Sequence, residues 1–200
     1  SKRRADCAPP LIADVRQQIR RFAVVVIRPA RVSDAASLAA IAERTFRETF
    51  AADNSAENID LHCAQKFSAH IQGEEISDPR LVTLLADIAG ELVGFAQLRL
   101  AQPTTSIKRD RPAELHRIYI SSKWHGRGVA SELMRAVYAA AANAGSDCLW
   151  LGVWERNLKA IAFYRKYGFS VVGDHVFMLG QDQQRDLIMA APLGSQSSVA

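Results

Sequence analysis

The 200-residue sequence has few of the residues that build metal centres or disulfide frameworks. Its three cysteines, at positions 7, 63 and 148, are scattered and form no Cys-x-x-Cys pair. An odd number of separated cysteines argues against a zinc site or a disulfide-stapled fold, and it fits a reducing cytoplasm. We therefore expect a cytoplasmic protein without a bound metal.

Long apolar runs are also missing. The longest covers only residues 136–142, and the next only residues 22–27, whereas a membrane-spanning helix needs about 20 apolar residues. The hydrophobic and charged fractions, 48% and 23%, are those of an ordinary globular protein. The sequence therefore predicts one domain that neither spans nor binds a membrane.

The excess of positive charge is confined to the start of the chain. Residues 1–31 contain eight basic and two acidic residues, while the remaining 169 residues have a net charge of −2. This body is not basic enough to indicate a nucleic-acid-binding protein. The basic segment either binds a polyanion or is a solvated extension. We expect a poorly ordered extension at residues 1–22, a domain at 23–193 and a tail at 194–200.

Apolar periodicity predicts a mixed α/β fold. In chain order it indicates a strand, two helices, three strands, a helix, a strand, a helix and two strands. The second helix is expected to start near residue 54, to continue through Ile71 and to be broken at Asp78–Pro79. Ala89–Gly90 is typical of a hairpin turn. This order predicts a single sheet with helices packed on it.

A glycine-containing turn follows the strand predicted at residues 114–120. It reads His125-Gly126-Arg127-Gly128-Val129-Ala130 and leads into a helix. Free N–H groups at a helix start bind anions, and glycine lets a phosphate approach the backbone. The alternative is a plain strand–helix turn. A dinucleotide-binding fingerprint is excluded because Ser131 stands where a third glycine is needed, and no Gly-Lys-Ser/Thr loop is present.

Two motifs resemble those of the GCN5-related N-acetyltransferases. The turn at residues 125–130 is similar to their coenzyme A turn, with His125 where Gln or Arg is usual. Residues 157–169 resemble the family segment Asn-x-x-Ala-x-x-Phe-Tyr-x-x-x-Gly-Phe. The resemblance covers roughly residues 24–191. Within the family, residues 45–50, 117–120, 150–155 and 186–189 resemble the PaiA-type spermidine/spermine acetyltransferases.

The resemblance implies a mixed, mostly antiparallel sheet whose fourth and fifth strands splay apart, with flanking helices and acetyl-CoA in the split. It implies backbone pairing of the cofactor with Ile118, Tyr119 and Ile120. The implied pyrophosphate site consists of His125, Gly126, Arg127, Gly128, Val129, Ala130 and Ser131. Asn157 would hydrogen-bond the cofactor. Lys166 is expected either to meet a phosphate or to remain solvated.

The resemblance also places Tyr164 beside the sulfur. A phenol hydroxyl there can protonate the departing thiolate, although an aromatic residue on a helix also serves in packing. The acceptor amine must lose a proton, because an alkylammonium has a pKa of about 10.4. Some relatives use a glutamate on the fifth strand, where this sequence has Gly152. Glu114 is our first candidate for the base and Glu155 the second; either carboxylate can instead be structural.

The acceptor side is expected to be acidic. Residues 43–78 contain eight acidic and three basic residues, and a cleft of one charge sign concentrates substrates of the other. The alternative is a solvated helix face. Phe50 and Trp154 are candidate walls of the site or core residues. We therefore expect acetyl transfer to a small-molecule primary amine such as spermidine or spermine, in a chain that can form a homodimer. The alternatives are a protein lysine or N-terminal acetyltransferase and a non-catalytic CoA-binding regulator.

Overall fold

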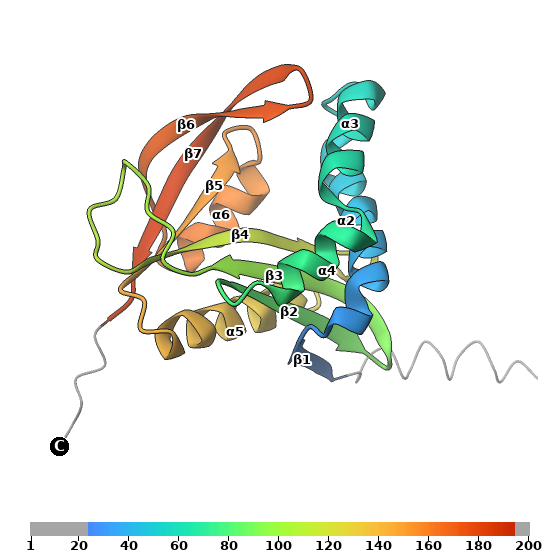
Figure 1. Cartoon of the computed structure of the whole chain (residues 1–200). Coiled ribbons are helices and arrows are strands. Elements are labelled where there is room, and N and C mark those ends of the chain that lie inside the picture. The colour runs from blue at the N-terminus through green and yellow to red at the C-terminus, as the bar shows by residue number, and fades with distance from the viewer. Residues whose placement is uncertain (1–23, 195–200) are drawn as a thin grey trace, which may run out of the picture.

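The computed structural model describes residues 24–194, in which one seven-stranded sheet carries helices on both faces (Figure 1). The strands are β1 (Val25–Pro29), β2 (Leu81–Ile88), β3 (Glu91–Arg99), β4 (Pro112–Ile120), β5 (Cys148–Trp154), β6 (Ser170–Leu179) and β7 (Asp182–Pro192). Their order in the sheet is β1-β2-β3-β4-β5-β7-β6. The predicted extension at residues 1–22 and residues 195–200 of the predicted tail lie outside the described part of the chain.

The helices form two groups on opposite faces of the sheet (Figure 1). They are α2 (Ala35–Phe50), α3 (Ala56–Lys66), α4 (Ala69–Ser77), α5 (Val129–Asn143) and α6 (Leu158–Lys166), with short 3-10 turns at Val32–Asp34 and Ser122–Trp124. Between residues 24 and 194, no helix combines the length and apolarity that a membrane crossing requires.

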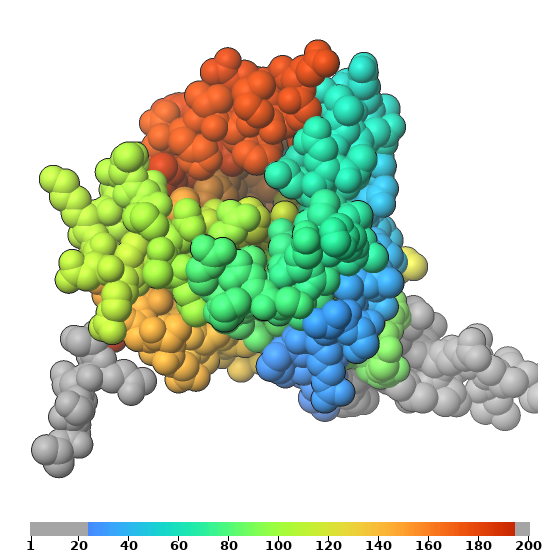
Figure 2. All heavy atoms as spheres, in the orientation of Figure 1, coloured from blue at the N-terminus to red at the C-terminus, as the bar shows by residue number. Residues whose placement is uncertain are grey.

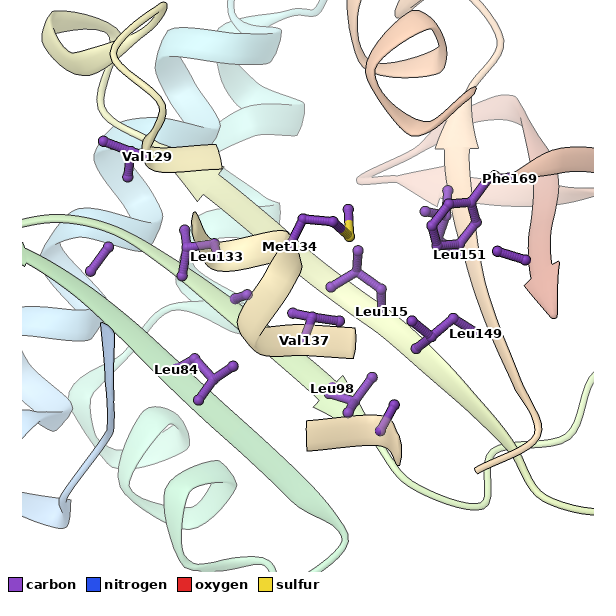
Figure 3. Packing of buried hydrophobic residues seen from close by; sticks show 14 of the residues in the cluster. Leu84, Leu98, Leu115, Val129, Leu133, Met134, Val137, Leu149, Leu151 and Phe169 are labelled. Atoms are coloured by element: carbon purple, nitrogen blue, oxygen red, sulfur yellow. The ribbon is translucent and has the colours of Figure 1, made fainter. Parts of the chain in front are cut away.

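The main core lies between α5 and the sheet. Leu133, Met134 and Val137 of α5 are fully buried and face Leu115 of β4 and Leu149 of β5 (Figure 3). A second core packs α2 and α3 against the opposite face of the sheet and contains Leu38, Phe46, Ile59, Phe67, Leu85 and Phe95. Burial on both faces explains why β2 and β3 are almost continuously apolar.

All neighbouring strands are antiparallel except β4 and β5. These two pair in parallel only where residues 112–114 meet residues 148–150. Beyond that point β4 continues to pair with β3, and β5 continues to pair with β7. The predicted splay of the fourth and fifth strands is therefore confirmed, and so is the predicted fold class.

The expected helix from residue 54 through Ile71 is wrong, because the structure has two helices there. The first ends at Lys66, and Phe67 leaves helical geometry to enter the aromatic core. Ser68 then caps a new helix: its hydroxyl oxygen accepts a hydrogen bond of 3.2 Å from the Ile71 N–H. Serine at this position supplies one of the partners that a helix start lacks.

The β6–β7 hairpin reaches across to α3. Near its tip the Gln181 N–H donates to Asn58 Oδ1 at 3.0 Å, and Gln184 Nε2 donates to Asn54 Oδ1 at 2.6 Å. Figure 2 shows the surface hollowed beneath this hairpin, between it, the α3–α4 region and the loop before β4. This hollow therefore lies on the side of the sheet that α2, α3 and α4 cover.

Candidate active site

The split leaves the β5-facing backbone of β4 without a strand partner. Residues 115–120 of β4 bond to β3 alone, so this edge can pair with an extended ligand, as predicted for Ile118–Ile120. One group on it is already engaged: the Ile120 carbonyl lies 2.9 Å from Nε2 of His125. The Ser121 N–H donates to the Val93 carbonyl of β3 at 2.9 Å. Because alternate residues of an antiparallel strand bond to the partner strand, the main-chain groups of Tyr119 also face β3. The backbone of Ile118 and the N–H of Ile120 are therefore the accessible part of the predicted cofactor edge.

The glycine turn leaves room for a phosphate. Gly126 and Gly128 have φ of 74° and 82°, a region that favours glycine, and no atom lies within 4 Å of the position that a Cβ would take on either. The first N–H groups that donate within α5 are those of Ser131 and Glu132, both to the Gly128 carbonyl. The preceding N–H groups thus remain at a helix N-terminus, a geometry that suits an anion.

Val129 and Ala130, the first two residues of α5, are able to take part in this site only through their backbone, whereas Ser131 also has a hydroxyl. The Val129 side chain is 1% exposed and belongs to the main core. Ala130 offers only a methyl group, and Ser131 is the first helical N–H donor. The residues present therefore fit the pyrophosphate role that was predicted for the turn, mainly through their main-chain groups.

His125 is held in place by a lysine that the sequence analysis did not select. Lys159 Nζ, at the start of α6, lies 3.2 Å from Nδ1 of His125. Because an ammonium only donates, Nδ1 is the acceptor and the Nε2–H of His125 donates to the Ile120 carbonyl. Lys166 lies seven residues further along α6, which corresponds to about 10 Å of helix. Lys159 is therefore better placed than Lys166 to meet a phosphate at the turn.

Two other charged or polar residues near the split also have local roles. Exposed Arg127 lies over the ring of Trp124, with its guanidinium carbon 5.2 Å from the ring centre. Asn157 caps α6, because its Oδ1 accepts from the Ala160 N–H at 3.1 Å. Its amide nitrogen is left for the predicted hydrogen bond to the cofactor.

Tyr164 lies on α6 among aromatic side chains. Its ring centre is 5.7 Å from that of Phe163 and 5.8 Å from that of Phe169. Burial raises the pKa of Tyr164 well above its ordinary value, and the nearby Tyr119 raises it further. The hydroxyl therefore stays protonated at neutral pH and is able to donate a hydrogen bond to a developing negative charge.

Glu114 lies where β4 and β5 still pair, at the closed end of the split. Its carboxylate is 3.4 Å from Arg99 and 3.3 Å from Nδ1 of His116. Burial acts to raise the pKa of Glu114, but His116 and Arg99 outweigh it, so the pKa lies below its ordinary value. These partners make Glu114 a weaker proton acceptor than a free glutamate. Glu155, the second candidate base, forms a 3.2 Å ion pair with Arg185.

A bulge in β4 directs side chains around the split. Gln97 and Leu98 on β3 oppose Arg117 and Leu115, which leaves His116 as the extra residue. A bulge bends its strand and re-aims the side chains beside it. Burial lowers the pKa of His116 more than Glu114 raises it, and its Nε2 is buried without a partner among residues 24–194.

The acidic helices carry less free charge than their composition indicates. Among the eight acidic residues, Glu43, Asp60, Glu75 and Asp78 form ion pairs with arginines. The Glu48 carboxylate accepts from the Ser122 N–H at 2.9 Å. In the described part of the chain no ion pair forms at the exposed residues Asp53 and Glu57, which flank the α2–α3 turn.

The rings of Phe50 and Trp154 meet across the split with centres 6.3 Å apart.

Sequence analysis did not select His175 and Asp186, which the structure brings to the same side. They are direct partners across the β6–β7 pair, 11 positions apart in sequence. Nδ1 of His175 and Oδ1 of Asp186 are buried without a hydrogen-bond partner in the described residues. The alternation of residues along a strand indicates which face of the sheet each side chain occupies. Only the register of the β6–β7 hairpin shows that the two side chains lie opposite each other. Residues 24–194 hold no group of three or more potential metal ligands.

Comparison with known proteins identifies the family. Residues 37–169 match the family model described as Acetyltransferase (GNAT) family. An uncharacterised N-acetyltransferase of Mycobacterium tuberculosis is 35% identical over 162 residues, which are 81% of this chain and 99% of that protein. A spermine/spermidine N(1)-acetyltransferase of Bacillus subtilis is 25% identical over 130 residues, 61% of this chain and 85% of that protein.

A solved structure shares the fold. The PaiA N-acetyltransferase of Thermoplasma acidophilum, in complex with coenzyme A, superposes with a TM-score of 0.69 and 23% identity, covering 84% of this chain and 99% of that one. The split sheet, the glycine turn and the matched family model agree with one another. The chain therefore belongs to the Acetyltransferase (GNAT) family and is an acetyl-CoA-dependent N-acetyltransferase.

Proposed function

We propose that this enzyme transfers acetyl directly to a primary amine of a polyamine such as spermidine or spermine. The observation that carries the choice is the surplus of carboxylates over residues 43–78, of which Asp53 and Glu57 have no ion-pair partner in the described part of the chain. Carboxylates beside a cleft concentrate polycations. The likeness to a relative named as a spermine/spermidine acetyltransferase supports the same choice.

The chain's own groups would hold acetyl-CoA along the split and at the turn. When bound, acetyl-CoA supplies a thioester whose acetyl group an amine can take. The β4 backbone at Ile118 and Ile120 offers an unpaired edge, and the N–H groups of residues 126–130 face the anion site. Lys159 and Arg127 add positive charge there. The amide nitrogen of Asn157 and the ammonium of Lys166 remain predicted contacts.

Tyr164 is proposed to stabilise the leaving sulfur. Its raised pKa keeps a proton on Oη, so the hydroxyl is able to donate a hydrogen bond and then the proton where negative charge develops. Glu114 remains a predicted base, but its lowered pKa and its contacts with Arg99 and His116 favour a structural role.

An amine panel tests the proposal. Thiol release from acetyl-CoA is measured with spermidine, spermine, free amino acids, an N-terminal peptide and a lysine peptide. We expect release with the polyamines at the highest kcat/KM. Release with only the peptides would replace the polyamine proposal with a protein acetyltransferase. Tight acetyl-CoA binding without release for any amine would indicate a non-catalytic CoA-binding regulator.

A further inference from the structure

Gly152 exposes bare backbone on β5. Its neighbours Leu151 and Val153 point into the main core and are 1% and 6% exposed. Gly152 itself is exposed and faces the other side of the sheet. Because successive residues of a strand point to opposite faces, this bare stretch of backbone lies on the side of α2 to α4.

Polar atoms of two residues surround that position. A Cβ on Gly152 would lie 3.0 Å from Cε1 and 3.7 Å from Nε2 of His175, and 3.5 Å from Oδ2 of Asp186. The His175 ring thus packs closely over the Gly152 backbone, and one imidazole nitrogen and one carboxylate oxygen lie beside the same backbone position. A small cationic group above Gly152 would contact both.

The strands hold this arrangement firmly. His175 and Asp186 are opposite each other in the β6–β7 pair, and Asp186 also pairs in register with Trp154 of β5. Asp186 therefore lies on a central strand of the β5-β7-β6 set. Side chains on paired strands have little freedom to drift apart, so the site is preformed.

The pair lacks a cation. Oδ1 of Asp186 and Nδ1 of His175 are buried without hydrogen-bond partners in residues 24–194. The neighbouring guanidinium, that of Arg185, is directed to Asp174 and Glu155 instead. A buried carboxylate without a donor is costly, and burial accordingly raises the pKa of Asp186 while His175 partly opposes this. A cation bound at Oδ2 would offset the charge of the same carboxylate, although it would not contact Oδ1 or Nδ1 directly.

We propose that Asp186 and His175 form the acceptor-amine subsite, in which the primary ammonium of the acceptor lies above Gly152. This inference rests on the proposed function. The ammonium donates to Oδ2 of Asp186, and one N–H proton passes to Nε2 of His175. The N–H bond breaks, an Nε2–H bond forms, and the electron pair stays on the amine nitrogen, which becomes nucleophilic. Histidine is the residue most often used for such a transfer.

The subsite is connected to the acetyl-transfer side of the split. Trp154 is the register partner of Asp186 on β5, and its ring centre lies 6.3 Å from that of Phe50. Phe50 and Tyr119 of β4 both pack against Phe46. Asp186 and Tyr119 therefore lie on the two sides of the same split. An amine held above Gly152 has the proton acceptor on one side and the acetyl-transfer groups on the other.

Two conservative variants separate binding from proton transfer. With spermidine as the acceptor, Asp186→Asn should raise its KM about tenfold or more, because a charge-assisted hydrogen bond is lost. His175→Gln should lower kcat about 10²-fold with a smaller change in KM. Both variants should keep the acetyl-CoA KM within about twofold. Asp174→Asn is the matched control, because it removes a carboxylate from β6 on the opposite, exposed face.

Calorimetry gives a reading independent of turnover. Spermidine should bind the enzyme–CoA complex more weakly after Asp186→Asn, while CoA binding is unchanged. Gly152→Ala should also weaken spermidine binding, because the new methyl group would lie 3.0 Å from Cε1 of His175 and push the imidazole aside without altering charge. The inference is overturned if the wild type acetylates spermidine and the Asp186 and His175 variants match it, or if they lose acetyl-CoA binding in parallel. A wild type that acetylates no amine of the panel overturns the proposed function itself.

Discussion

Burial changes the chemistry that Tyr164 is able to perform. Removed from water among Phe163 and Phe169, its phenol holds its proton more tightly than a solvated tyrosine. A tightly held proton favours hydrogen-bond donation to negative charge over early proton release. Tyr164 is therefore suited to a step in which charge appears on a neighbouring atom.

Tyr164→Phe tests this directly. The substitution keeps the ring and its packing, and it removes only the hydroxyl. We expect kcat to fall about 10²-fold while the acetyl-CoA KM stays near that of the wild type. Tyr167→Phe, on the same helix, is the matched control. Wild-type turnover in Tyr164→Phe would leave the residue a packing role only.

Two substitutions at Gly128 separate the effect of backbone strain from the effect of added charge on cofactor binding. The φ of 82° at this position strains any other residue, so Gly128→Ala and Gly128→Glu should each cost about 1–2 kcal/mol of stability. Only glutamate adds a negative charge at the anion site. Measured by calorimetry, the affinity of Gly128→Glu for acetyl-CoA should be more than tenfold lower than that of Gly128→Ala. Equal affinities for the two variants would contradict phosphate binding at this turn.

At the scale of elements, Glu114 holds two adjacent strands together. It lies on β4, it pairs in register with Arg99 of β3, and it also contacts His116 at the bulge. The contacts fix the end of the split where β4 and β5 are still paired. A carboxylate used in this way contributes to the shape of the site more than to proton transfer.

Glu114→Gln should therefore lower stability and spare turnover. The pKa of Glu114 in the folded protein lies below its ordinary value. Its negative charge therefore stabilises the fold at any pH above the pKa of about 4.3 that it has in the unfolded chain. That stabilisation is lost as the pH falls through the pKa of the folded protein. Urea unfolding should show a loss of about 1–2 kcal/mol at neutral pH that shrinks on acidification. Glu91→Gln, at the exposed start of β3, is the control. A 10²-fold loss of kcat with unchanged stability would make Glu114 the base instead.

Sequence patterns predicted the strands well because alternation and apolar runs report burial directly. The glycine turn was predicted for a different reason: free N–H groups at a helix start bind anions, and glycine lets a phosphate approach the backbone. The structure adds that Gly126 and Gly128 both have positive φ. The break between α3 and α4 was missed because Phe67 continues the apolar periodicity of a helix while its backbone does not. His175 and Asp186 were missed because their meeting depends on the register of the β6–β7 hairpin, which residue spacing alone does not fix.

At the scale of the whole molecule, the two ends of the split differ in charge. The predicted cofactor turn brings together His125, Arg127 and Lys159, whereas the proposed acceptor side presents Asp186 and the helices of residues 43–78. A polyanionic cofactor and a polycationic acceptor would thus enter from regions of opposite sign. Such a division speeds encounter and orients both substrates before contact.

This division predicts a salt dependence that scales with the charge of the acceptor. Exposed charges are screened over about 8 Å at physiological ionic strength, so added salt weakens the attraction of Asp53 and Glu57 for a distant cation. The KM for spermidine, which carries several charges, should rise more steeply with salt than the KM for butylamine, which carries one. Both amines place one ammonium at the same subsite, so the contribution of the direct contacts at that subsite is the same for both and cancels in the comparison. If the two KM values rise in parallel, the acidic helices do not attract the acceptor, and selectivity lies in the contacts at Asp186 and His175 alone.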